Sequence, residues 1–146
     1  MRKSVGRSHM YLLDTHAWVW LVNEDEQIKR SKTLTTILAA SARGRVGVSV
    51  ISVWEVSLLA RKGRLSFVEG VRRWVSTALA DDHIVLMPLS EEIALRCNEL
   101  PGEFHGDPAD RILVATAAVM GAILVTRDQR ILDYGKSHEF FNVQPL

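Results

Sequence analysis

The stretch DPADRILVATAAVMGAILVTRD, residues 107–128, contains the signals for one complete helix followed by a strand. Asp107 followed by Pro108 is typical of a helix start, because an N-cap carboxylate accepts backbone N–H bonds and proline suits the first helical position. Gly121 favours a helix end just before it, and the apolar run after it predicts a strand. The stretch therefore predicts a helix over residues 108–120 that leads directly into a buried strand.

The rest of the chain alternates in the same way. Short apolar runs predict strands, and apolar residues at helical spacing predict amphipathic helices between them. We expect strands at residues 10–13, 46–50, 84–87, 122–125 and 140–143, and helices at residues 15–22, 31–43, 53–62, 69–80, 90–100 and 108–120. This alternation is typical of an α/β domain with helices on both faces of a mainly parallel sheet of about five strands.

Length and composition fit one small globular domain. The chain has 146 residues, which fits a single domain, expected at residues 10–146. Residues 1–9 are basic and polar, and we interpret them as a disordered leader, an upstream start or an expression remnant. The net charge is +1, so any surface that attracts nucleic acid must be local. One cysteine and no long apolar run predict a cytoplasmic protein with no membrane span.

Acidic residues stand where the predicted strands end or where the following helices begin. They are Asp14, Glu55, Asp107, Asp110 and Asp128, with Glu55 expected in the first turn of its helix. Because parallel strands end at one edge of a sheet, these carboxylates are expected to gather there. Uncompensated carboxylates repel one another, and an oxygen-only ligand set selects Mg²⁺, with Mn²⁺ as a possible substitute. The pattern predicts a metal site.

Each acid, taken singly, also fits an ordinary role in capping a helix. Asp14 and Asp107 fit N-caps, and Asp128 fits the start of a short helical segment. Ser52 and Glu55 fit a capping box, which would place Glu55 at the third helical position. The argument for a metal site rests on the acids taken together, because separate elements place them at the same predicted edge of the sheet.

Four runs resemble the motifs of a known family in order and spacing. They are YLLDTH at 11–16, SVISVWE at 49–55, DPADRILVATA at 107–117 and LVTRD at 124–128. Each run alone is weak, but four in this order are specific. The chain resembles PIN-domain proteins from residue 10 to its C-terminus, and within them the VapC-like toxins of bacterial toxin–antitoxin pairs.

The resemblance implies a PIN-like three-layer α/β/α fold and a Mg²⁺-dependent endoribonuclease. It also implies a homodimer and a VapB-like antitoxin whose C-terminal segment covers the active-site groove. Asp14, Glu55, Asp110 and Asp128 match the acids that bind metal and carry catalysis in this family. Asp107 matches an extra acid found in only part of it. A PIN-like DNA nuclease and a catalytically silent RNA-binding PIN module remain alternatives.

Several residues near the acids are candidates for supporting roles. The hydroxyls of Thr15 and Thr126 are expected to hydrogen-bond the metal-binding carboxylates. The candidates for contact with RNA phosphates are Arg61, Lys62, Arg64, Arg111 and Arg127. Any one of these cations is also explained as a surface charge or as half of an ion pair, and Arg111 is expected to pair with a carboxylate if it does not contact RNA.

Two other classes that gather carboxylates at a sheet edge fit less well. A receiver domain needs an aspartate after a middle strand and a lysine after a late one, but Pro88 follows residues 84–87 and Arg127 follows Thr126. A haloacid-dehalogenase-like phosphatase needs a second aspartate two residues after Asp14, where His16 stands. The nuclease reading is therefore preferred on the residues themselves.

Overall fold

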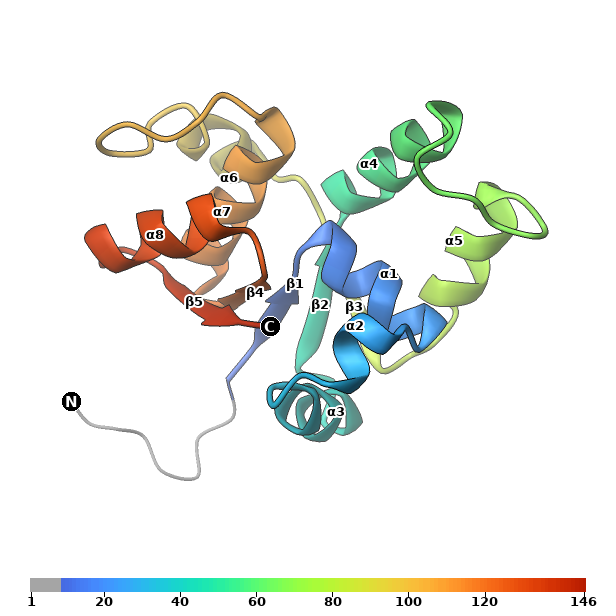
Figure 1. Cartoon of the computed structure of the whole chain (residues 1–146). Coiled ribbons are helices and arrows are strands. Elements are labelled where there is room, and N and C mark those ends of the chain that lie inside the picture. Colours follow the sequence, from blue (N-terminus) through green and yellow to red (C-terminus); the bar gives the residue numbers. More distant parts are fainter. Residues whose placement is uncertain (1–8) are drawn as a thin grey trace.

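Strands and helices alternate along the chain in the computed structural model, which describes residues 9–146 (Figure 1). The strands are β1 (Tyr11–Leu13), β2 (Val46–Ser49), β3 (Ile84–Met87), β4 (Ile123–Thr126) and β5 (Asn142–Pro145). The helices are α1 (Thr15–Asn23), α2 (Glu26–Lys29), α3 (Leu34–Ala42), α4 (Val50–Arg61), α5 (Val71–Leu79), α6 (Glu91–Arg96), α7 (Pro108–Met120) and α8 (Gln129–Ser137). No helix of this described part is long and apolar enough to cross a membrane. The leader predicted at residues 1–9 lies outside the described residues except for its last one.

The five strands form one sheet in the order β3-β2-β1-β4-β5, and every neighbouring pair is parallel. The predicted parallel sheet is thereby confirmed. Leu13 in the central strand β1 is in register with Val48 of β2 and with Val125 of β4. Strands β2 and β3 extend the sheet on one side of β1, and strands β4 and β5 extend it on the other. The topological switch point therefore lies between β1 and β4. Ligand sites of parallel sheets form beyond the strand ends at such a point.

Helices cover both faces of the sheet and bury a separate core on each (Figure 1). Leu12 packs in the core under α7 and α8, with Leu113 and Ile131. The next residue, Leu13, faces the opposite core, which it shares with Trp18 of α1 and with α3, α4 and α5. Successive residues of a strand point to opposite faces, so a central strand buried on both must be apolar throughout. This arrangement is the predicted three-layer α/β/α fold.

The start of α4 differs from the sequence prediction. The helix begins at Val50, three residues earlier than expected, because the Ser49 hydroxyl caps it by accepting the Ile51 N–H at 3.0 Å. Ser52 is therefore an interior, fully buried residue of the helix. The predicted capping box of Ser52 and Glu55 is wrong, and Glu55 lies in the second turn instead of the first.

Other elements differ mainly in their length. The short helix α2 was not predicted, and α8 continues to Ser137 although only a short segment was expected after Asp128. Helices α3 and α6 are shorter than the predicted ranges, and β5 lies two residues further along the chain than expected. The helix predicted at residues 108–120 matches α7 at both ends, because a proline at its start and a glycine after its end mark both limits.

Gly121 ends α7 in the left-handed conformation, with φ of 64°, and no heavy atom lies within 4 Å of where a Cβ would stand. We predict that Gly121→Ala lowers the free energy of unfolding by about 1 kcal/mol, because an alanine strains this conformation without any clash. Gly106 is the matched control, since it is equally open but has no positive φ. Gly106→Ala should leave stability unchanged or slightly higher in the same urea titration, and an equal loss in both variants would contradict the account.

Candidate active site

A pocket of about 370 Å³ opens at the carboxyl edge of the sheet, beside the switch point between β1 and β4. Figure 1 shows α1 and α8 beginning at this edge, directly after β1 and β4. All five predicted acids line the pocket. The lining residues are Asp14, Thr15, His16, Trp20, Glu55, Asp107, Asp110, Leu113, Arg127, Asp128 and Arg130. The structure therefore brings together acids that stand as far apart in sequence as residues 14 and 128.

Asp14 lies at the bottom of the pocket and is only 9% exposed. One carboxylate oxygen caps α1 by accepting the Ala17 N–H at 2.8 Å, and the other accepts the Thr126 hydroxyl at 2.5 Å. The Thr126 oxygen in turn accepts the backbone N–H of Asp128 at 3.0 Å. Thr126 thus connects the ends of β1 and β4, and it fixes the orientation of Asp14.

Glu55 reaches the pocket from the second turn of α4. Its Oε1 lies 2.5 Å from the Thr15 hydroxyl, which also lies 2.9 Å from the hydroxyl of Ser52. A hydroxyl has a single proton, so when Thr15 donates to the carboxylate it accepts from Ser52. This contact holds Glu55 toward the first turn of α1 although 40 residues separate the two side chains.

Two acids enter from the start of α7. Asp107 caps the helix, accepting the Ala109 N–H at 2.9 Å and the Asp110 N–H at 3.4 Å. Asp110 lies in the first turn, and its Oδ2 is 2.7 Å from Nε2 of His105. The side chains of His105 and Asp110 are 18% and 14% exposed, so this contact is mostly shielded from water.

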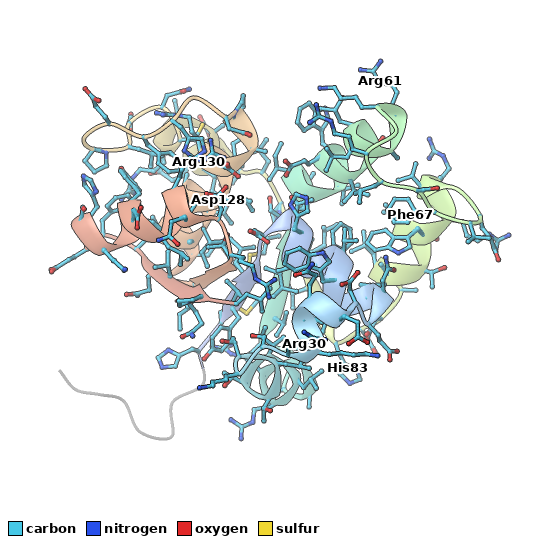
Figure 2. All side chains as sticks on the ribbon, viewed as in Figure 1. Arg30, Arg61, Phe67, His83, Asp128 and Arg130 are labelled. Carbon is cyan, nitrogen blue, oxygen red and sulfur yellow. The ribbon has the colours of Figure 1, made fainter. Side chains whose placement is uncertain are left out.

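Asp128 caps α8 and forms an ion pair with Arg130, whose Nη2 lies 3.1 Å from Asp128 Oδ2 and 4.0 Å from Asp110 Oδ2 (Figure 2). Sequence reasoning missed both Arg130 and His105. The available signal was proximity, since Arg130 falls in the first turn of the helix that Asp128 opens, and His105 stands two residues before Asp107.

Burial and mutual repulsion perturb these carboxyls. Burial raises the pKa of Asp14 above its ordinary value, against hydrogen bonds from Thr126 and Ala17, and the charge of Glu55 adds to the rise. Burial likewise raises the pKa of Glu55 and of Asp110, and in each case the charges of neighbouring acids raise it further.

Asp128 behaves differently from Asp14, Glu55 and Asp110. Burial acts to raise its pKa, but the hydrogen bonds and positive charge of Arg130 outweigh burial, and the pKa lies below the ordinary value. Arg130 therefore offsets the charge of Asp128, whereas burial dominates at Asp14, Glu55 and Asp110, although the same guanidinium lies 4.0 Å from Asp110.

These features fit a divalent cation. The acids offer only oxygen ligands, which suits Mg²⁺ or Mn²⁺, and their repulsion is what a bound cation would relieve. Asp14, Glu55, Asp110 and Asp128 are the residues that would hold it. Within residues 9–146, three metal-ligand atoms lie within 4.8 Å of one another only at Asp81, Asp82 and His83, in an exposed turn away from the pocket. The carboxylates of the pocket are spaced more widely than that.

The predicted phosphate-binding cations divide into three groups. Arg127 lines the pocket, lies 4.8 Å from the ring centre of Trp20, and donates to Gln27 and to the carbonyl of Leu146. Its side chain holds the C-terminal residue beside the site.

Arg111 forms its hydrogen bonds with backbone carbonyls. Its guanidinium donates to the backbone carbonyls of Cys97, Phe104 and His105 at 3.0–3.4 Å, and so fixes the loop before α7. The predicted pairing of Arg111 with a carboxylate is wrong, because these carbonyls take its N–H groups. Its contribution to the site is to hold the segment that carries His105.

The third group consists of Arg61, Lys62 and Arg64, which are exposed at the far end of α4 and do not line the acidic pocket. Arg61 is six residues beyond Glu55, which is about 9 Å along a helix. Figure 2 shows Arg61 pointing outward there, well apart from Asp128 and Arg130.

The PIN domain family model matches residues 11–137, and it therefore includes every element that lines the pocket. The chain belongs to the PIN-domain family, as the sequence motifs indicated. Within that family it is similar to Ribonuclease VapC22 of Mycobacterium tuberculosis, with 30% identity over 120 residues, which are 82% of this chain and 88% of the relative.

Solved structures share the fold at lower identity. VapBC2 from Rickettsia felis, bound to a DNA fragment from its promoter, has a TM-score of 0.68 at 18% identity and covers 94% of this chain and 98% of its own. DNA-bound VapBC from Salmonella typhimurium has a TM-score of 0.67 at 15% identity, with the same coverage. Both similarities concern the fold.

The raised pKa of Asp14 predicts how pH affects the metal-free protein. A group whose pKa is higher in the folded than in the unfolded state binds its proton more tightly when the protein is folded. The free energy of unfolding therefore falls as pH rises from the ordinary pKa to the raised one. Asn at this position keeps the helix cap and removes the charge. In EDTA, Asp14→Asn should melt above wild type at neutral pH, because the amide carries no charge that burial would destabilise.

The advantage of Asp14→Asn should shrink as pH falls toward and below the ordinary aspartate value of 3.8, because the carboxyl is then increasingly protonated in the folded and the unfolded state alike. Differential scanning fluorimetry across this range measures it. Asp81→Asn, a change at an exposed acid outside the pocket, serves as the control. A wild type that melts above Asp14→Asn at neutral pH in EDTA would contradict the proposed repulsion.

Proposed function

We propose that this protein is a Mg²⁺-dependent endoribonuclease and the toxin of a VapBC-type toxin–antitoxin pair. The observation that carries the proposal is the group of acids that line one pocket at the switch point of a PIN-domain sheet, where burial and neighbouring charges raise the pKa of Asp14, Glu55 and Asp110. The similarity to a ribonuclease along most of both chains supports RNA as the substrate.

The four acids have different roles in this proposal. Asp14 is the central metal ligand, because its orientation is fixed from both sides by Thr126 and by Ala17. Asp110 and Asp128 complete the ligand set from α7 and α8. Glu55, held by Thr15, binds metal directly or through water and orients the attacking water.

The reaction is the addition of water across an RNA phosphodiester. Water attacks phosphorus, the bond to the 3′ oxygen breaks, and that oxygen takes up a proton, which leaves 5′-phosphate and 3′-hydroxyl ends. A bound divalent cation supplies charge neutralisation at the phosphate and lowers the pKa of a coordinated water. Asp107 keeps its cap role and adds negative charge near Glu55 and Asp110.

Positive groups at the rim would receive the RNA backbone. Arg127 and Arg130 line the same pocket as the acids, and Arg130 is largely exposed. Because both already contact protein groups, they would offer phosphates a preorganised positive edge. Arg61, Lys62 and Arg64 would contact RNA only at a distance from the cut.

The proposed partners follow from the family. Structures of toxin–antitoxin complexes with the same fold support a VapB-like antitoxin, and we propose a homodimer that acts in the cytoplasm. A PIN-like DNA nuclease would use the same metal chemistry, and a silent RNA-binding module would not need the complete set of acids seen here.

Cleavage of a structured RNA pool by the purified protein tests the function. We predict cutting with Mg²⁺ or Mn²⁺, none in EDTA, and a loss of at least about 100-fold in Asp14→Asn, because the variant removes the best-oriented ligand of the metal. Asp81→Asn is the control and should cut like wild type.

A parallel assay with single- and double-stranded DNA separates the alternatives. Cutting of DNA and not RNA would replace the proposal by the DNA nuclease. Retained RNA cutting by Asp14→Asn would refute the assigned site. Binding of RNA without cutting, by a folded protein freed of partners, would favour the silent module.

A further inference from the structure

A second cavity, of about 360 Å³, lies between the loop before α7 and the outer face of α8. Its lining residues are Glu103, Phe104, His105, Arg130, Asp133, Tyr134, Ser137 and His138. None of the acids assigned to the metal lines it. Apart from Arg130, the residues of this cavity have been given no role in the function proposed above.

Aromatic and histidine rings line one side of this cavity. Phe104 packs against His105 with ring centres 4.2 Å apart and against Tyr134 at 4.6 Å, and Tyr134 stacks on His138 at 4.2 Å. Tyr134 is buried and donates its hydroxyl to Pro101, while the other three rings are partly exposed. Fixed π-faces of this kind are surfaces on which unpaired nucleobases stack.

The cavity adjoins the acidic pocket directly. Arg130 lines both, and the side chains that separate them are in contact, since His105 on the cavity side lies 2.7 Å from Asp110 on the pocket side. A polynucleotide with a phosphate in the acidic pocket would therefore have its neighbouring base within reach of this cavity.

The polar groups of the cavity suit a base better than a phosphate. Glu103 and Asp133 are exposed carboxylates that would repel a phosphate but can accept hydrogen bonds from an exocyclic amine. Ser137 adds an exposed hydroxyl at the end of α8. Cation and anion are thus separated, with Arg130 toward the pocket and the two acids toward the outside.

We propose that this cavity, formed by the loop before α7 and by α8, binds an unpaired RNA base next to the scissile phosphate and selects bases with an exocyclic amine. The assignment rests on the proposed ribonuclease function. It makes Glu103 and Asp133 specificity residues, and makes the rings of Phe104 and His138 the stacking surface.

Filling the cavity tests this proposal. Ser137→Trp introduces a large side chain at an exposed lining position, and Lys136→Trp, its exposed neighbour outside the cavity, is the matched control. On single-stranded RNA with Mg²⁺, Ser137→Trp should lower kcat/KM by roughly 10-fold through a higher KM, because base stacking is lost. Lys136→Trp should match wild type, and melting temperatures establish that both are folded.

Mapping of the cut ends gives a second, independent readout. Wild type should favour adenine, cytosine or guanine over uracil at one fixed position beside the cut, and Glu103→Gln should weaken that preference, since an amide can also donate to uracil. Glu99→Gln, an exposed acid outside the cavity, should retain it. Glu103→Gln tests the proposal even if Ser137→Trp fails to fold.

The outcomes separate the two proposals. A wild type that cuts no RNA overturns the proposed function. If the wild type cuts RNA, an unchanged kcat/KM in Ser137→Trp or an unchanged base preference in Glu103→Gln overturns only the proposed base-binding cavity.

Discussion

The parallel alignment of β1 with β2 and β4 determines where the acids of the pocket lie. It places the ends of β1 and β4 side by side, where Asp14 and Asp128 begin the next helices. A carboxylate that caps a helix at a strand end also faces the pocket beyond the sheet. The same carboxylates therefore cap helices and line the pocket, so the fold gathers its acids without any further structural element.

Gathering carboxylates in this way has an electrostatic cost, and the protein offsets part of it. Hydroxyls, backbone N–H groups and a histidine hold the acids, as Thr126 and Ala17 do for Asp14, and Arg130 neutralises Asp128. The pKa of Asp14 nevertheless lies above its ordinary value, so hydrogen bonding does not fully compensate for burial. The uncompensated charge gives the pocket a physical reason to take a divalent cation, which is the basis of the nuclease proposal.

Local signals in the sequence were sufficient for the fold and for the position of the acids. Both ends of α7 were predictable because proline and glycine act within one turn. The start of α4 was not, since the serine that the sequence suggested as its cap, Ser52, is buried inside the helix, and Ser49 at the end of β2 forms the cap. Side-chain partners were least predictable. The contact of Thr15 with Glu55 spans 40 residues, and the approach of Arg130 to Asp110 depends on how α8 packs beside α7.

Calorimetry of Mg²⁺ binding measures both the affinity of the pocket for the cation and the protons that the cation displaces. Titrating Mg²⁺ into the metal-free protein by calorimetry, at mildly acidic pH in buffers of different ionisation enthalpy, counts the protons displaced. Acids with raised pKa values must lose protons when a cation binds among them, so the account predicts saturable binding with proton release that disappears in Asp14→Asn. Equal binding by Asp14→Asn, or no binding by the folded wild type, would contradict it.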